Sequence, residues 1–280
     1  MTRYLVYDVF TETPFGGNPL AVIPEAEGLA EALLQNIARE FNFSETAFVL
    51  PPREEGHTAR VRIFTPTQEV PFAGHPTIGA ALALHDEGGL TEMVLELGVG
   101  PIPCTVAGGR ARFVTRRPLE RLHDVDAELV AEALGLAASD IVTARHAPVM
   151  ASVGLPFVFA ELGGAEALAR AAPAIASFRA GQARYPSPFD FALAPYVREG
   201  DRIRMRMFAP LDNIPEDPAT GSAAAALGAL LAALSGGPVT LDIAQGVEMG
   251  RPSRILVEAG PGGVAVEGAA RRVMEGRLLL

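Results

Sequence analysis

The sequence predicts an α+β protein of two pseudo-symmetric lobes, each a curved, mostly antiparallel sheet wrapped around a central helix. Three observations lead to this fold class. Short runs of β-branched and aromatic residues between Gly and Pro dominate the 280-residue chain and are typical of strands. Residues 80–84 and 223–227 are small or apolar on every face of a helix, which indicates that both helices are buried. An internal repeat contains both helices.

The repeat relates residues 62–81 to residues 206–223. Each copy reads Arg-x-Phe-x-Pro, then a proline five residues later, then Pro-x-x-Gly-x-Ala at the expected start of a helix. Phe64 and Phe208 are 144 positions apart, whereas Gly79 and Gly221 are 142 apart, so the second copy has lost two residues in its loop. The agreement in order and spacing predicts a gene duplication.

The elements follow from hydrophobic periodicity and turn residues. In the first half, strands are expected at 4–10, 20–23, 46–50, 59–64, 94–97 and 111–115, and helices at 29–41 and 77–86. In the second half, strands are expected at 141–144, 157–161, 189–193, 202–208, 239–243, 254–258 and 264–267, and helices at 127–134 and 219–234. The polar stretch 116–126 carries no strand pattern and is the expected crossover. The first lobe is therefore 1–117 with 270–280 returning to it, and the second is 118–269.

Composition excludes several classes of function. A chain with a net charge of −10 lacks the positive electrostatic field that binding of nucleic acid requires. The absence of lysine excludes a Schiff-base enzyme and a Walker-type phosphate site. A single cysteine, Cys104, excludes an internal disulfide and reads as a small buried residue. With no apolar segment of membrane-spanning length and no signal-peptide pattern, we expect a cytoplasmic protein without a membrane partner.

Glu45 is the main candidate for proton transfer. Phe43, Ala47 and Phe48 flank it and are expected to desolvate it in part, which raises the pKa of the carboxyl. A carboxyl tuned in this way takes and gives a proton near neutral pH. The alternative is an ordinary glutamate at the surface of a strand.

His75 and Asp217 lie at the expected starts of the two apolar helices. The positive end of a helix dipole disfavours imidazolium, so His75 is expected to be neutral and to contact a substrate carboxylate or carbonyl. Asp217 is a candidate hydrogen-bond partner for substrate or an assistant to the acid/base group. The alternatives are a structural cap for His75 and, for Asp217, an N-cap with Pro218 near the first helical position.

The remaining candidates would bind substrate. Ser222 and the N–H groups of Gly74 and Gly221 are expected to hold a substrate carboxylate at the helix starts. Asn18, in a Gly-rich turn without dinucleotide spacing, is expected to line the cleft. Arg251, in the loop 245–253, reads equally well as a carboxylate ligand or a surface residue. The histidines show no metal-ligand spacing, so no metal is expected.

Together these motifs resemble the phenazine-biosynthesis isomerase (PhzF-like) family, which has the diaminopimelate-epimerase-like fold. The matching stretches run through most of the chain, at 8–23, 43–50, 62–80, 216–223 and 245–253. The resemblance implies a site between the lobes, no cofactor, and a homodimer. It also implies that Glu45 moves a proton between carbon atoms while His75, Asp217, Ser222 and Gly74 bind the substrate. Racemases of this fold use one cysteine from each helix start, and this chain has none there.

The sequence therefore predicts a cofactor-independent isomerase acting on a small carboxylate. Two alternatives stay open: a racemase or epimerase that uses Glu45 and Asp217 as a pair, and a non-catalytic homologue that binds a small ligand. The motifs do not identify the substrate.

Overall fold

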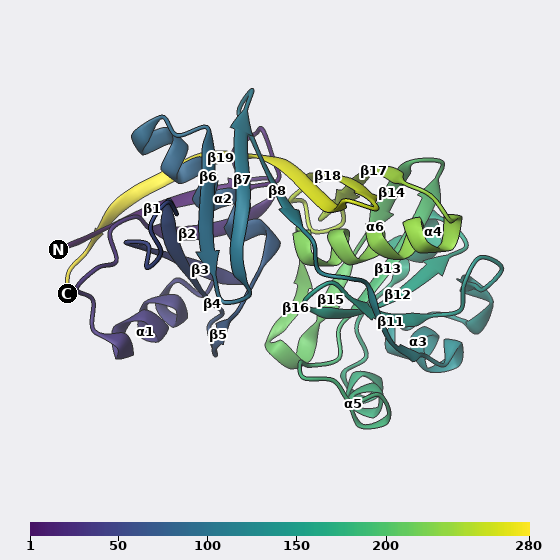
Figure 1. The fold of residues 1–280 in the computed structure, drawn as a ribbon. Coiled ribbons are helices and arrows are strands. Elements are labelled where there is room, and N and C mark those ends of the chain that lie inside the picture. Colours follow the sequence, from purple (N-terminus) through teal and green to yellow (C-terminus); the bar gives the residue numbers. More distant parts are fainter. The chain divides into compact units, whose positions relative to one another are not determined.

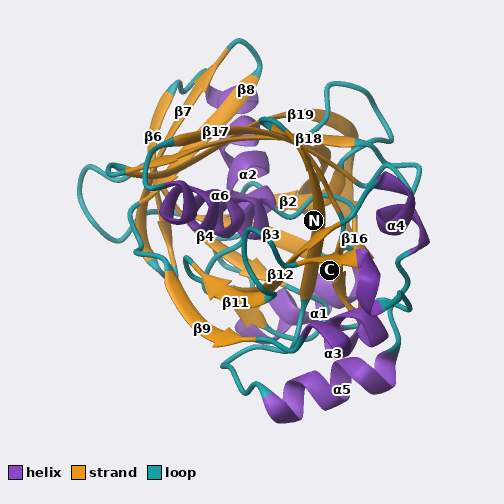
Figure 2. Ribbon diagram, turned by 90° about the vertical axis from the view of Figure 1, so that its right-hand side faces the viewer, coloured by secondary structure: helices purple, strands orange, loops and turns teal.

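The computed structural model describes residues 1–280, and the chain divides into two compact units (Figure 1). The first comprises Met1–Thr115 and Ala265–Leu280, and the second comprises Arg116–Val264. The first division thus lies two residues before the expected lobe boundary after residue 117, and the return begins at Ala265, five residues earlier than the expected residue 270. Strands make up most of the regular structure (Figure 2). No helix has the length and apolar character needed to cross a membrane.

The first unit is a sheet that closes on itself. Its elements are β1 (Thr2–Val9), β2 (Asn18–Ile23), α1 (Glu31–Phe41), β3 (Glu45–Leu50), β4 (Ala59–Phe64), β5 (Glu69–Val70), α2 (Gly74–Gly88), β6 (Glu92–Leu97), β7 (Gly100–Ala107), β8 (Arg110–Thr115) and most of β19 (Gly263–Leu278). The order is β1, β2, β3, β4, β6, β7 and β8, and β19 pairs with both β8 and β1. Helix α2 packs against β1, β2, β3, β7 and β8, so it is the central helix.

The second unit has more helices at its periphery. Its elements are β9 (Glu120–Asp124), α3 (Ala127–Ala133), η1 (Ala138–Asp140), β10 (Ile141–Val142), β11 (Val149–Ser152), β12 (Pro156–Leu162), α4 (Ala165–Arg170), α5 (Ile175–Arg184), β13 (Leu193–Glu199), β14 (Arg202–Met205), β15 (Met207–Ala209), η2 (Pro210–Asp212), β16 (Ile214–Asp217), α6 (Gly221–Ser235), β17 (Val239–Gln245) and β18 (Ser253–Gly260). Helix α6 packs against β11, β12, β17 and β18.

The two units share one pattern of strand pairing. In the first unit, β1 to β2 is antiparallel, β2 to β3 parallel, β3 to β4 antiparallel, β4 to β6 parallel and β6 to β7 antiparallel. In the second, β11, β12, β13, β14, β17 and β18 repeat the same alternation. Five successive orientations agree, which extends the repeat from a sequence motif to the topology.

The structure corrects the alignment of the two helices. Both have 15 residues and end at a left-handed glycine, Gly89 or Gly236. Gly221 is the first residue of α6, whereas Gly79 is the sixth of α2, so the pairing of Gly79 with Gly221 was wrong. The equivalent of Gly221 is Gly74. The first N–H groups of a helix have no partner within the helix, so a proline can lie in the first turn or before it. The proline of the repeat therefore does not mark the same helix position in both copies.

Several expected elements also differ. The stretch 116–126 contains β9, which pairs with β11; its side chains are almost all exposed, and no alternation of buried residues marks it. The strand expected at 189–193 is β13, which begins at Leu193 and continues through Pro195. The strand expected at 202–208 is interrupted at Arg206. Strands β5, β7, β11 and β16 and helices α4 and α5 were not predicted.

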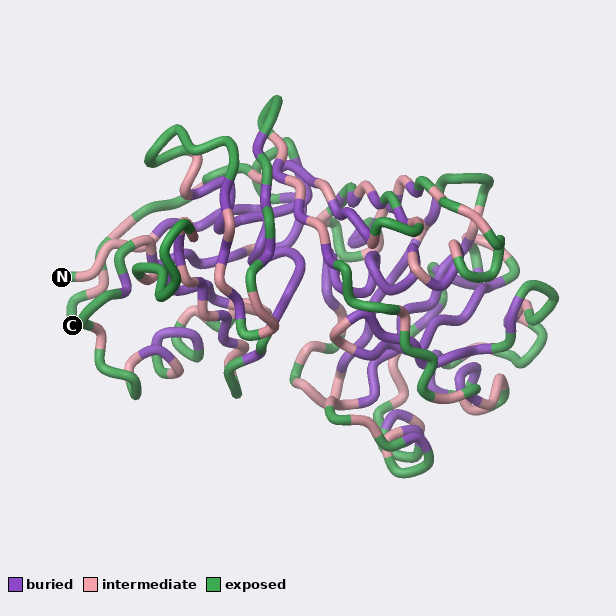
Figure 3. Tube along the Cα trace, in the orientation of Figure 1, coloured by how far each residue is buried: buried purple, intermediate pink, exposed green.

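Small residues let the central helices approach the strands closely. The first ten residues of α2 and the first eight of α6 are all buried (Figure 3). A Cβ at Gly79 would lie 2.3 Å from Leu20 Cδ2 and 3.0 Å from Val9 Cγ2, and Leu20 is fully buried. At Gly88, in the same helix, the nearest such contact is an ordinary 3.8 Å.

We therefore expect Gly79→Ala to lower the free energy of unfolding by about 1–3 kcal/mol through overpacking. Gly88→Ala should leave it unchanged or raise it by up to about 1 kcal/mol, because alanine favours helix. Urea unfolding followed by circular dichroism measures both. Equal effects of the two substitutions would contradict close packing at Gly79.

Candidate active site

In the first unit, three secondary-structure elements bring polar residues to one place. Asn18 begins β2, Glu45 begins β3, and His75 is the second residue of α2. Strands β2 and β3 are parallel neighbours, with Leu20 opposite Glu45, and α2 packs against both. The starts of the two strands therefore lie beside the start of the helix.

The contacts among these residues are specific. His75 Nδ1 lies 3.5 Å from Glu45 Oε2 and 3.4 Å from Asn18 Nδ2. Ser44 Oγ donates to Asn18 Oδ1 at 3.0 Å and holds the amide in place. The Glu45 side chain is 16% exposed and that of His75 is 3% exposed. The structure thus brings together three of the predicted residues, and it adds Ser44, which sequence reasoning missed although it precedes Glu45.

His75 is neutral in this setting. Burial lowers the pKa of His75 to about 3, and the backbone carbonyl of Pro19 offsets only part of that effect. The contact with Glu45 is therefore not an ion pair near neutral pH. His75 Nε2 is buried without a hydrogen-bond partner. Such an atom costs about 1–3 kcal/mol, which a ligand that supplied the missing partner would recover.

In the second unit, Asp217 is anchored but does not cap the helix. Asp217 is the last residue of β16 and is 4% exposed. Thr220 Oγ1 donates to Asp217 Oδ2 at 2.5 Å, and α6 begins one residue later at Gly221. The N-cap residue is Thr220, and Pro218 lies outside the helix, which corrects the expected capping alternative. Ser222, the second residue of α6, is buried.

Gln245 forms hydrogen bonds that hold the same turn in place. It was not among the predicted site residues, although it lies in the predicted loop 245–253. Its side chain contacts Thr220 and the backbone of Asp217, and it is fully buried. The predicted loop 245–253 is the turn of a hairpin, because Gln245 ends β17 and pairs with Ser253 at the start of β18. The burial of one glutamine cannot be recognised in a loop-like sequence. Arg251 lies partly exposed in this turn.

Both helix starts lack a capping side chain. Ala73, the N-cap residue of α2, has none to offer, and the Thr220 hydroxyl is bonded to Asp217. The N–H groups of the first turn, at Gly74 in one unit and at Gly221 and Ser222 in the other, therefore keep their capacity to donate. Together with the helix dipole, such groups attract anions.

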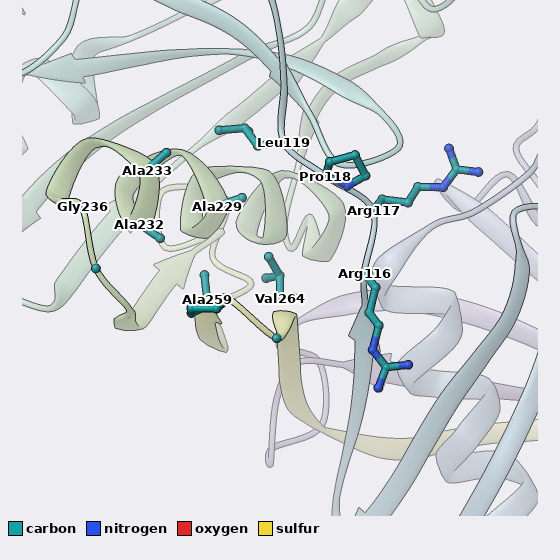
Figure 4. Close-up of a pocket in the computed structure, with 15 residues that line it drawn as sticks. Arg116, Arg117, Pro118, Leu119, Ala229, Ala232, Ala233, Gly236, Ala259 and Val264 are labelled. Carbon is teal, nitrogen blue, oxygen red and sulfur yellow. The ribbon is translucent and has the colours of Figure 1, made fainter.

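The thiol of Cys104 is buried and unreactive. Burial raises the pKa of the Cys104 thiol to about 12, which keeps it protonated, and Cys104 is 2% exposed. No three His, Cys, Asp or Glu side chains are grouped to hold a metal ion. A cavity in the second unit is lined by the end of α6, the stretch 116–119 and the β18–β19 turn (Figure 4). It contains none of the predicted site residues.

Comparison with known proteins supports the resemblance. The family model described as "Phenazine biosynthesis-like protein" matches residues 7–276. The chain is 37% identical to trans-2,3-dihydro-3-hydroxyanthranilate isomerase of Pseudomonas aeruginosa, with 100% of both chains covered. It is 40% identical to an uncharacterised isomerase of Mesorhizobium japonicum, with 99% of both covered.

A solved structure agrees with both matches. The PhzF-family phenazine biosynthesis protein of Bacillus anthracis superposes with a TM-score of 0.87 at 25% identity, over 100% of this chain and 99% of that one. The predicted family and fold class are confirmed. The chain belongs to the phenazine biosynthesis-like (PhzF) family and is an isomerase.

Proposed function

We propose that the protein isomerises a small carboxylate without a cofactor and that Glu45 is the general acid/base. The observation that carries the proposal is the contact of Glu45 with a buried, neutral His75 at an uncapped helix start. Because the ring is neutral, its contact with Glu45 adds no opposite charge that would hold the carboxyl in its ionised form. A carboxyl in this contact can accept a proton from carbon and return it.

The proposed reaction has two proton transfers. Glu45 removes a proton from an activated carbon, so a C–H bond breaks and a carboxyl O–H bond forms. The same carboxyl then protonates another carbon of the same molecule, and a double bond shifts between them. Nothing is oxidised or reduced overall. His75 bears no charge at any step, and its unpartnered Nε2 is assigned to the substrate.

We assign substrate binding to the two helix starts. The substrate carboxylate would accept from the N–H groups of Gly74 and Gly221 and from the Ser222 hydroxyl, while Asp217 and Asn18 contact its other polar groups. This assignment of the substrate contacts rests on the family resemblance. A homodimer and a cytoplasmic location rest on the same ground.

The name of the Pseudomonas aeruginosa relative supplies the first compound to test, trans-2,3-dihydro-3-hydroxyanthranilate. In D2O, NMR should show its isomerisation with solvent deuterium at one carbon of the product. If this compound does not react, other unsaturated cyclic carboxylates form the panel. A panel in which no compound isomerises or exchanges a C–H proton would count against an isomerase that uses this chemistry.

With a reacting compound, Glu45→Gln should lower kcat by about 10²-fold or more, because an amide cannot accept and return the proton. Deuterium incorporation should fall in parallel. The matched control is Glu40→Gln, which makes the same change at an exposed position of α1 and should leave turnover unaltered. Wild-type turnover in Glu45→Gln would refute the assigned role.

His75 should show no titration between pH 5 and 8 in ring 15N NMR, with His75→Asn identifying its signal. The folded pKa of about 3 lies below the ordinary 6.5, so the unfolded state binds the proton more readily. Stability from His75 is thus present above about pH 6.5 and is lost as the pH falls toward 3, by up to about 1.4 kcal/mol per pH unit. A midpoint near 6.5 would contradict a neutral, buried ring.

A further inference from the structure

The connection between β16 and α6 departs from the usual start of a helix after Asp-Pro. An aspartate in this position commonly caps the helix, with proline as the first helical residue. Here α6 begins at Gly221, after Thr220, and the Asp217 carboxylate instead accepts the Thr220 hydroxyl at 2.5 Å. A separate set of contacts holds this arrangement.

Gln245 determines the direction of the hydrogen bonds. Its Oε1 accepts the Thr220 N–H at 3.0 Å, and its Nε2 donates to the Asp217 carbonyl at 2.8 Å. The reverse orientation of the amide would lose both bonds. Nε2 also donates to Thr220 Oγ1 at 2.9 Å. Because an amide N–H only donates and a carboxylate only accepts, the Thr220 hydroxyl accepts from Gln245 and donates to Asp217.

The chain of bonds has two consequences. The single hydroxyl proton of Thr220 is committed to Asp217, so Thr220 cannot donate elsewhere. Asp217 ends β16, before the first residue of α6, and the Thr220 hydroxyl donates to one of its two carboxylate oxygens and so orients the carboxylate.

The hairpin β17–β18 is fixed against the same turn. Ser253 Oγ lies 2.9 Å from the carbonyl oxygen of Pro218 and 3.1 Å from that of Gln245, and its one O–H is shared between these two acceptors. Gly246 has a φ of +72°, and a Cβ there would collide with the carbonyl oxygens of Pro218 and Arg251. The hairpin therefore packs closely against the Asp217–Thr220 turn, and a side chain at position 246 would not fit.

We propose that Gln245 and Thr220 are positioning residues for the isomerase, acting on substrate through Asp217. They orient its carboxylate, so that Asp217 and the N–H groups of α6 contact different groups of the substrate. This inference rests on the proposed function, in which Asp217 touches the substrate.

The test compares Thr220→Val, which removes the hydroxyl at similar volume, with Thr220→Ser, which keeps it. With the reacting compound, Thr220→Val should lower kcat/KM about 10- to 100-fold, the value of a hydrogen bond to a charged group. Most of the change should be a rise in KM. Thr220→Ser should restore kcat/KM to within about threefold of wild type. Loss of folded protein alone would lower apparent kcat in proportion and leave KM unchanged.

Gln245→Met removes the amide at similar volume and should raise KM in the same way. Thermal unfolding shows whether each variant is folded, and Thr220→Ala replaces Thr220→Val if the latter is not. Wild-type KM in a folded Thr220→Val or Thr220→Ala would overturn the inference.

A double-mutant cycle separates this inference from the proposed function. Asp217→Asn should be impaired, and adding Thr220→Val should cause no further loss, because both changes remove the same interaction. Full activity of Asp217→Asn would refute the role of Asp217 in the proposed function. An impaired Asp217→Asn in which Thr220→Val still has its full effect would show that Thr220 acts elsewhere, and this inference would fail.

Discussion

The burial of an apolar helix inside a curved sheet is the constraint on which the rest of this structure depends. A helix of alanine, glycine and leucine can be surrounded by strands, as α2 is by five of them, but its first N–H groups are then brought into the interior. A capping side chain commonly satisfies one of these groups. Here Ala73 has nothing to offer and the Thr220 hydroxyl is committed elsewhere. The donors that packing leaves unused are the ones an anionic substrate would use.

The polar residues around the two helix starts follow from the same constraint. A charged histidine at the start of α2 would be opposed by burial, and burial accordingly lowers the pKa of His75. A carboxylate at the start of α6 would be attracted by the dipole, and a chain of hydrogen bonds from Gln245 through Thr220 orients the Asp217 carboxylate. One unit thus presents a neutral ring and the other an oriented negative charge.

The features that could be predicted are those that a short stretch of sequence determines. The repeat, the apolar helices and the residues Asn18, Glu45 and His75 were all predictable, and the structure brings these three together. Features that depend on residues far away in the sequence could not be predicted. The polar strand β9 exists because β11 lies beside it, and the burial of Gln245 depends on the turn before α6. The helix start at Gly221 could not be read from Pro218, because a proline near a helix start can lie inside or outside the first turn.

The long strand β19 gives the two units different folding histories. The second unit is one continuous segment, Arg116–Val264, whereas the first needs Ala265–Leu280 to connect β8 with β1 and close its sheet. During synthesis, residues 1–115 leave the ribosome before the second unit, and the edges of β1 and β8 stay open until residues 265–280 emerge. Open edges invite pairing with other chains. The time taken to translate the second unit therefore sets how long the first is open to such pairing, and removal of residues 265–280 would leave the same two edges uncovered.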